Sequence, residues 1–465
     1  MILILGIVAN GCISDGFTNS PSDILSFSTD TVSFDTVFTG VGTPTARLKV
    51  YNRAKKSVNI SSISFSKDDG TFQMNVDGVS GKRFSDVEIR GGDSIFVFIE
   101  CLIPEGSSAT PSLVEDKVVF VTNGVSQDVL VEAWGQNVTR LKGVNIKEDM
   151  RLTADRPYIV FDSLTVEQGA TLRIDPGVQL LFHDKASMRV RGKIEAIGEV
   201  GRMIDMRGDR LDNVLPNVGY DILAGQWKGI TIEAESFDNR LEYVDMRSTE
   251  HGLVVDSCGN LERSKLLIVN SWLHNSQESA LKSEYAKVDA YGSVFSESAG
   301  ATVSLKGGSH EFVQCTLANY YLFSAISSPI LSLYHCLPAD KEEDPMNDNP
   351  LMRANFENGI IYGLAKDLNI GDFADSDVYM RNMLLKSNGE DDEHFIDCVW
   401  GEDPLFKTDR PSYYFNYRVQ EDSPAIGAGN YGYVVPLCER DMDGNLRQNP
   451  PTLGAYCYVE EEKDK

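Results

Sequence analysis

An internal period of 22 residues limits the folds open to this chain more than any other feature. The segments "NSWLHNSQESAL", "GSVFSESAGATV" and "QCTLANYY" can be laid over one another. Ser271, Ser293 and Cys315 then align at steps of 22 residues, as do Trp272, Val294 and Thr316. A fixed period of this size indicates a solenoid. Because the repeats carry strand-like alternation, the sequence predicts a right-handed parallel β-helix with about three short strands in each coil.

The same short strands begin well before the repeats. In "LTVEQGATLRIDPGVQLLF" (164–182) the apolar residues mostly alternate, and two turns interrupt them. Gly169 permits one tight corner, and Pro176-Gly177 forces another. The density of strands predicts that the β-helix covers residues 144–400.

Residues 25–137 have a different strand pattern, with longer predicted strands such as "VSFDTVFTG" and "VVFVTNGVSQDVLVEAWGQ". About seven strands separated by Gly, Asn and Asp turns predict a β-sandwich. The segment "NVTRLKG" (137–143) is predicted to be a linker between the sandwich and the β-helix. The expected fold class is therefore all-β.

The N-terminal segment "MILILGIVANGCISDG" resembles a bacterial secretion signal that ends in a lipobox. Ile2 to Val8 is apolar, and small residues precede Cys12, which we expect to be the lipidated residue after removal of the signal within residues 1–12. The alternative is a buried first strand. Residues 13–24 are predicted to be a tether. No segment has eighteen consecutive apolar residues, so we expect membrane attachment through the lipid anchor only.

The net charge of −26 bears on possible partners. So acidic a chain repels phosphate backbones, and we expect no nucleic-acid partner. The eight cysteines form no CxxC pair, which argues against a zinc ribbon. Cys438 and Cys457 flank a turn-rich segment and are the best candidates for a disulfide.

Two parts of the chain resemble known families. The motifs "VSFDTVFTG", "IRGGDSIFVFIE" and "VVFVTNGVSQDVLVEAWG" resemble hydin-type Ig-like domains of bacterial surface and cilium-associated proteins, which implies a spacer or binding module. The tail "DPLF…SPAIGAG…DMDGNLR…GAY" resembles β-helix lipoproteins common in Bacteroidetes. This second resemblance spans residues 144–458 and implies an exported outer-membrane or cell-surface lipoprotein.

Three residues at the stacked corners are the candidate catalytic groups: Glu250, His274 and Glu297. Successive coils could bring them within several ångströms, where carboxylates and an imidazole could act on a sugar. The alternative is a solvated corner. The Asn-Thr-Asp, Gly-His-Gly and Arg-Ile-Lys motifs of polygalacturonase-like hydrolases are missing, as is the pectate-lyase signature.

Aromatic residues gather near the C-terminus, where residues 401–465 are predicted to cap the β-helix. Trp400, Tyr413 and Tyr414 are candidate sugar-binding residues, because sugar rings stack on such side chains; the alternative is that they seal the last coil. No metal site is predicted. The segment "DMDGN" (441–445) has oxygens at alternate positions, as calcium loops do, but a tight Asp-Gly turn explains it better. The acidic runs 340–344 and 389–394 are expected to be solvated loops that could hold Ca²⁺ weakly.

Three functions remain open from the sequence. The first is non-catalytic binding or adhesion, to a polysaccharide or a surface protein, with a glycan as the expected ligand. The second is a carbohydrate-active enzyme, either a polysaccharide lyase or a glycoside hydrolase. The third is a purely structural surface protein. A cleft lined by all three candidate catalytic residues would favour the enzyme, and exposed aromatic side chains would favour binding.

Overall fold

The computed structural model describes residues 16–106, 111–215, 218–326, 328–334, 350–369 and 377–460. The chain divides into two compact units, residues 1–138 and 139–465. Residues 1–12 with Cys12, and the acidic run 340–344, lie outside the described residues. None of the helices within the described ranges is both long and apolar enough to cross a membrane.

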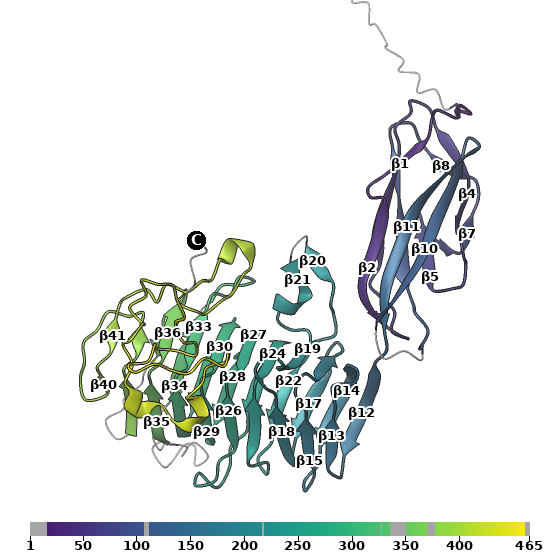
Figure 1. Ribbon diagram of the computed structural model, residues 1–465. Helices are drawn as coiled ribbons and strands as arrows, with labels where there is room; N and C mark the ends of the chain where they lie inside the picture. The colour runs from purple at the N-terminus through teal and green to yellow at the C-terminus, as the bar shows by residue number, and fades with distance from the viewer. Residues whose placement is uncertain are drawn as a thin grey trace, which may run out of the picture. The chain divides into compact units, whose positions relative to one another are not determined.

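The first unit is a sandwich of two β-sheets (Figure 1). The first sheet contains, in spatial order, β1 (Leu25–Phe27), β3 (Ala46–Asn52), β9 (Ser94–Cys101), β5 (Phe72–Val76) and β6 (Val79–Gly81). The second contains β2 (Thr31–Phe38), β11 (Val125–Gln136), β10 (Ser112–Thr122), β4 (Val58–Phe65) and β7 (Arg83–Phe84), with β8 (Val87–Ile89) also on β4. Alternate residues of these strands point inward. The inward side chains, which include Val97, Ile99 and Val118, form one buried hydrophobic core between the two sheets. The predicted β-sandwich is confirmed.

The segment predicted to be a tether is partly attached to the sandwich. Phe17 pairs with Ser57, and the backbone N–H of Thr18 donates to the carbonyl of Ser57 at 2.9 Å. The side chain of Asn123 donates to the carbonyl of Asp23 at 2.9 Å. Residues 17–23 therefore belong to the folded unit, because their backbone groups are hydrogen-bonded to the sandwich.

The second unit is a parallel β-helix with three faces (Figure 1). The first face contains β13 (Met150–Leu152), β15 (Thr171–Ile174), β18 (Lys193–Ile197), β23 (Asn239–Glu242), β26 (Leu266–Val269), β29 (Lys287–Tyr291), β32 (Gly308–Val313), β35 (Leu351–Glu357), β38 (Asp377–Arg381) and β40 (Phe395–Ile396). The second face contains β16 (Gln179–Phe182), β19 (Ile204–Gly208), β24 (Val244–Thr249), β27 (Trp272–Ser276), β30 (Val294–Ser298), β33 (Thr316–Asn319), β36 (Ile360–Gly363), β39 (Leu384–Leu385) and β41 (Val399–Trp400). The third face contains β17 (Ser187–Val190), β22 (Gly229–Ile232), β25 (Leu253–Val255), β28 (Leu281–Glu284), β31 (Val303–Lys306), β34 (Leu331–Tyr334) and β37 (Leu368–Asn369).

The pairing register confirms the 22-residue period. Trp272 pairs with Val294, and Val294 pairs with Thr316, as the sequence alignment predicts. Inward side chains form apolar ladders, since every coil places the same position over its neighbour. One such ladder on the third face is fully buried and runs through Met188, Ile230, Leu253, Leu281, Val303 and Leu331.

The first coil begins earlier than the sequence suggests. β12 (Thr139–Ile146) pairs in parallel with β14 (Tyr158–Val166), and both strands continue across the second and third faces. The segment 137–143, predicted to be a linker, therefore mostly forms a strand of the β-helix, because its residues find backbone partners in β14. The predicted corners are present, since Gly169 and Gly177 have φ of 86° and 81°.

The C-terminal segment, residues 401–460, covers the outer side of the second face (yellow in Figure 1). Val294, Ile360 and Leu384 point outward from that face and pack against residues of the segment that include Phe406, Tyr417, Leu453 and Tyr456. The side chains of Phe295, Ile361 and Leu385 point into the coil. The predicted C-terminal cap thus exists, and it covers a side of the β-helix. This segment contains η2 (Arg410–Ser412), η3 (Tyr431–Tyr433) and η4 (Pro436–Cys438).

The expected disulfide is not formed. Cys438 and Cys457 are both free thiols, as are the other four cysteines in the described residues. Cys438 is fully buried, and the thiol of Cys457 donates to the carbonyl of Asn445. Flanking a turn-rich segment is therefore not enough to pair two cysteines, because the bond also needs converging side chains.

Asp289 on β29 gives the stability a pH dependence. Burial raises the pKa of its carboxyl to about 6. The folded state therefore holds this proton more tightly than the unfolded state, so the contribution of Asp289 to stability falls as pH rises from about 4 to 6. We expect Asp289→Asn to stabilise the protein by about 1–3 kcal/mol at pH 7.5 and to have little effect at pH 4. Denaturant unfolding midpoints at the two pH values test this, and equal shifts at both would contradict it.

Candidate functional site

A pocket of about 290 Å³ lies on the second face where it meets the C-terminal segment. Its walls come from three parts of the chain. β24 and β27 supply the floor, the insertion between β19 and β22 supplies one side, and the C-terminal segment supplies an aromatic side. The lining residues are Asp221, Ile222, Asp245, Arg247, Trp272, His274, Asn275, Tyr413, Tyr414 and Phe415.

Strand alternation explains why the floor is charged. In β24 the side chains of Val244 and Met246 point into the β-helix, so those of Asp245 and Arg247 point outward. Stacking of the coils then places Arg247 beside His274 and Asp245 beside Trp272. The outer side of the second face is thus polar at β24, and it becomes apolar from β30 onward, where the C-terminal segment covers it.

The insertion between β19 and β22 contains β20 (Asn213–Leu215), β21 (Val218–Gly219) and η1 (Tyr220–Ile222). Two side chains of the second face hold η1 in place. Ser248 donates to the carbonyl of Asp221 at 2.8 Å, and Asn275 donates to the carbonyl of Ile222 at 2.7 Å. These bonds fix one wall of the pocket.

A chain of opposite charges crosses the floor. The guanidinium of Arg247 lies 2.9 Å from a carboxylate oxygen of Asp205 and 2.7 Å from one of Asp245. Asp245 also lies 3.0 Å from Nε2 of His274. The Arg247 side chain is only 12% exposed, so these pairs are poorly screened by water.

The pKa values follow from this arrangement. Burial opposes ionisation of Asp245, but the nearby Arg247 and His274 outweigh it and hold its pKa below the usual range. Burial raises the pKa of Asp205, against the influence of Arg247. Burial also opposes the charge of Arg247, and the two aspartates outweigh it and raise its pKa. Asp245 and Arg247 are therefore ionised together.

His274 is held with both ring nitrogens facing oxygen acceptors. Its Nε2 faces Asp245, and its Nδ1 contacts Oδ1 of Asn275. The amide of Asn275 is oriented by its own bond to the carbonyl of Ile222, so its oxygen must face the imidazole. Both ring nitrogens are therefore occupied, and the imidazole is held in a fixed orientation.

Aromatic rings form the other wall. The indole of Trp272 stacks on the imidazole of His274 at 4.2 Å between centroids, and its Nε1 donates to Ser296 at 2.8 Å. Tyr413 and Tyr414 are 36% and 54% exposed. Tyr413 has a φ of 56°, a conformation that non-glycine residues adopt rarely and that occurs often at functional sites.

The three candidate catalytic residues occupy different places. His274 lines the pocket. Glu297 is 1% exposed and accepts hydrogen bonds from Ser296 and Tyr417, beneath the C-terminal segment, and burial raises its pKa. Glu250 lies at the corner after β24, in an ion pair with Lys228 at 2.5 Å that lowers its pKa. Their catalytic role stays a prediction, but they do not line this pocket together.

The candidate binding residues also lie in different places. The pocket contains Tyr413 and Tyr414. Trp400 lies in β41 of the last coil, where its ring contacts Phe395 at 5.1 Å and its Nε1 donates to Asp391 at 3.0 Å. It packs against the β-helix core, in agreement with the alternative that these aromatic residues seal the last coil.

The candidate Ca²⁺ loop at 441–445 is an Asp-Gly turn. The buried carboxylate of Asp441 accepts hydrogen bonds from the backbone N–H groups of Asp443, Asn445 and Cys457. The described part of the chain contains no group of three or more His, Cys, Asp or Glu side chains that could hold a metal ion. Weak Ca²⁺ binding elsewhere stays a prediction.

Sequence reasoning missed Asp245 and Arg247, although a signal was present. The motif Asp-Met-Arg occurs in β19 as residues 205–207 and again in β24 as residues 245–247, and the structure pairs Asp205 with Asp245. The two copies are 40 residues apart because the insertion interrupts the 22-residue period. A search for repeated motifs that allowed an insertion would have found them.

Comparisons with known proteins give no family for the chain. No family model matches it. No curated protein matches it either. Three solved structures have a TM-score of 0.18: a family 123 glycoside hydrolase from Clostridium perfringens (8% identity, 25% of this chain), the VesB protease of Vibrio cholerae (12%, 24%) and the periplasmic chaperone SfaE (16%, 24%). The similarity spans 30%, 31% and 57% of those chains, and such low scores support no argument about function.

Proposed function

We propose that this protein binds glycans without cleaving them, at the pocket between the second face and the C-terminal segment. The observation that carries the proposal is that two exposed tyrosines share one pocket with a floor whose charged side chains pair with one another. Aromatic walls with a few oriented polar groups are the usual composition of small-molecule sites. Because the charges of the floor pair with one another, a neutral, hydroxyl-rich ligand fits better than a strongly charged one.

The size of the pocket agrees with a short stretch of polysaccharide. At about 290 Å³ it lies just below the range for small-molecule sites, roughly 300–1,000 Å³. The side chains of Asp245 and Arg247, which the ring of His274 helps to orient, can offer hydrogen bonds to sugar hydroxyls. Tyr413 and Tyr414 can pack against the apolar face of a sugar ring.

Catalysis by a lyase or a hydrolase is the second candidate. One observation favours it, since the pKa values of the neighbouring Asp205 and Asp245 are displaced in opposite directions, as in acid–base pairs. Against it, both carboxylates pair with Arg247, and Asp205 is not among the lining residues. A glycosidase acid must reach the glycosidic oxygen from the pocket. Binding without cleavage is therefore preferred.

The location of the protein is part of the proposal. We infer an exported surface lipoprotein of the Bacteroidetes β-helix type, anchored in the outer membrane through Cys12. The lipobox-like N-terminus and the motifs of the C-terminal segment support this. At such a surface, polysaccharide or a surface protein would be the partner. Labelling with a radioactive fatty acid, lost in Cys12→Ser, tests the anchor.

Tyr414→Ala tests the site. The side chain is more than half exposed, so its removal should leave the fold intact. We expect affinity for the bound polysaccharide to fall about 10- to 100-fold, which is the usual effect of removing a central aromatic contact. The measurement is affinity electrophoresis or calorimetry on a glycan panel, with new reducing ends and unsaturated uronates scored in parallel.

Tyr431→Ala is the matched control, because Tyr431 is also an exposed tyrosine of the same segment but lies outside the pocket lining. It should bind as the unaltered protein does. Equal affinity of the Tyr414→Ala and unaltered proteins would remove this pocket as the glycan site. Product formation that depends on His274 or Asp245 would favour the enzyme.

A further inference from the structure

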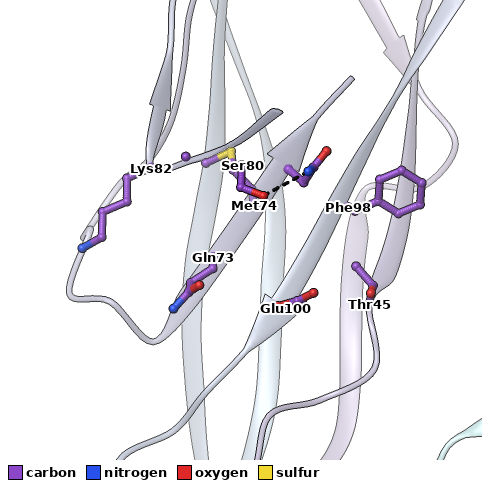
Figure 2. A pocket seen from close by; sticks show the side chains of 9 residues that line it. Thr45, Gln73, Met74, Ser80, Lys82, Phe98 and Glu100 are labelled. Atoms are coloured by element: carbon purple, nitrogen blue, oxygen red, sulfur yellow. Dashed lines mark hydrogen bonds between the residues drawn. The ribbon is translucent and has the colours of Figure 1, made fainter. Parts of the chain in front are cut away.

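A second pocket, of about 350 Å³, lies on the sandwich and has no role in the proposed function. It opens on the outer side of the first sheet of the sandwich (Figure 2). Its lining residues are Thr45, Gln73, Met74, Asn75, Ser80, Gly81, Lys82, Phe98 and Glu100. Figure 2 shows Lys82 and Phe98 on opposite sides, with Gln73 and Glu100 between them in the view.

The strand register explains how these side chains meet. β9 lies between β3 and β5, and Phe98 pairs with Arg47 on one side and with Asn75 on the other. Asn75 in turn pairs with Ser80 of β6. Glu100 pairs with Gln73 in the next row. Residues directly opposite in a sheet have neighbouring side chains, so one aromatic ring and several polar groups form a continuous surface.

Phe98 differs from the other aromatic rings on this side of the sheet, because no cation stacks over it in the described structure. The guanidinium of Arg47 and the ammonium of Lys49 stack over Phe96, at 5.3 and 5.4 Å from its centroid. Lys49 also lies 5.1 Å from the Tyr51 ring. Phe98 is half-buried, and within the described chain it carries no such cation; its ring contact is with Phe96 at 6.0 Å.

The amide of Asn75 is fixed and its oxygen is covered. Its Nδ2 donates to the hydroxyl of Ser80 at 3.1 Å. Its Oδ1 is shielded from water, so a ligand does not reach it. The amide of Gln73 and the hydroxyl of Ser80 are exposed in the lining and can bond a ligand.

The polar groups define the class of ligand. Thr45, Gln73, Asn75 and Ser80 carry neutral amides and hydroxyls, which donate and accept as sugar hydroxyls do. The two charged groups, Lys82 and Glu100, have opposite signs. A strongly anionic ligand would meet the carboxylate, and a cationic one would meet the ammonium.

We propose that the sandwich pocket binds a neutral sugar residue, with the ring of Phe98 against the apolar face of the sugar and the side chains of Gln73 and Ser80 bonding its hydroxyls. This site is separate from the pocket on the β-helix. The sandwich is then a glycan-binding module and the chain has two glycan sites.

The experiment uses the full chain carrying Tyr414→Ala, so that the β-helix pocket contributes little. Retention is measured by affinity electrophoresis in gels containing glucan, mannan, xylan or galactan, with polygalacturonate as the anionic glycan. We expect retention by at least one neutral glycan. Phe98→Ala and Gln73→Leu should each weaken it about tenfold or more.

Phe96→Ala is the matched control, because Phe96 lies two residues away on the same side of β9 and outside the pocket lining. It should keep the binding. Unchanged retention of Phe98→Ala, equal loss in Phe96→Ala, retention by polygalacturonate alone, or no retention by any neutral glycan would overturn the proposal. These outcomes leave the β-helix site untouched, because that site is judged by Tyr414→Ala against the unaltered chain.

Discussion

A chain that ends at Gly401 is expected to be insoluble or to unfold at much lower denaturant concentration than the full protein. Removal of the C-terminal segment would expose the outer side of the second face. Val294, Ile360 and Leu384 are at most 1% exposed beneath that segment. Each would lose about 1.5–3 kcal/mol of burial. The sum is comparable to the whole stability of a typical domain, roughly 5–15 kcal/mol.

Lost hydrogen bonds add to this effect. Asn358, a corner residue with φ of 54°, donates to the carbonyl of Asn430 and accepts from its N–H, both at 2.8 Å. The hydroxyl of Thr316 accepts from the N–H of Ala455 at 2.9 Å. The truncation would leave these polar groups beside exposed apolar side chains.

Soluble yield, gel filtration and chemical unfolding measure the effect. A chain ending at Glu460 is the control, because it keeps every described residue. It should behave as the full protein does. A monomeric chain 1–401 with an unchanged unfolding midpoint would show that the segment adds little to the stability of the β-helix.

Much of the fold could be predicted from the sequence because the β-helix repeats itself. A coil of constant length places equivalent residues at a constant spacing in the sequence. The alignment of Trp272, Val294 and Thr316 therefore predicts the strand pairing that the structure shows. The position of the C-terminal segment was harder to predict. Adjacent apolar pairs such as Val294-Phe295 and Ile360-Ile361 indicate strands buried on both sides, but they do not say which segment covers the outer side.

The candidate site was predicted only in part, for a related reason. Tyr413, Tyr414 and His274 were selected from separate patterns, and the structure brings them into one pocket. The stacking of coils predicts that Glu297 lies at a corner of the β-helix, but Tyr417 of the C-terminal segment covers it. The spacing of coils predicts neighbours within the β-helix. It cannot predict contacts made by a segment that returns from more than a hundred residues away.

Arg247→Met is expected to destabilise the protein by about 3–5 kcal/mol at pH 7 and to abolish glycan binding at the β-helix pocket. Methionine keeps much of the volume but removes the charge shared by Asp205 and Asp245. The two aspartates would then face each other without the guanidinium that both contact, in a partly buried site. Chemical unfolding and affinity electrophoresis measure the two effects.

Arg173→Met is the matched control. Arg173 also pairs with two carboxylates, those of Asp149 at 2.9 Å and Glu195 at 3.0 Å, but its side chain is 47% exposed. Exposed pairs of this kind contribute about 0–1 kcal/mol, so this variant should be nearly as stable as the unaltered protein and should bind glycan equally.

The pH dependence separates loss of charge from loss of packing. In the unaltered protein Asp245, whose pKa is lowered, contributes stability that is present above its unfolded pKa of about 4 and is lost only at lower pH. Without Arg247 the carboxylates should protonate more readily, and the deficit of Arg247→Met should shrink as pH falls from 7 toward 4. A deficit that stays constant over this range would mean that packing of the side chain, and not its charge, holds the floor of the pocket together.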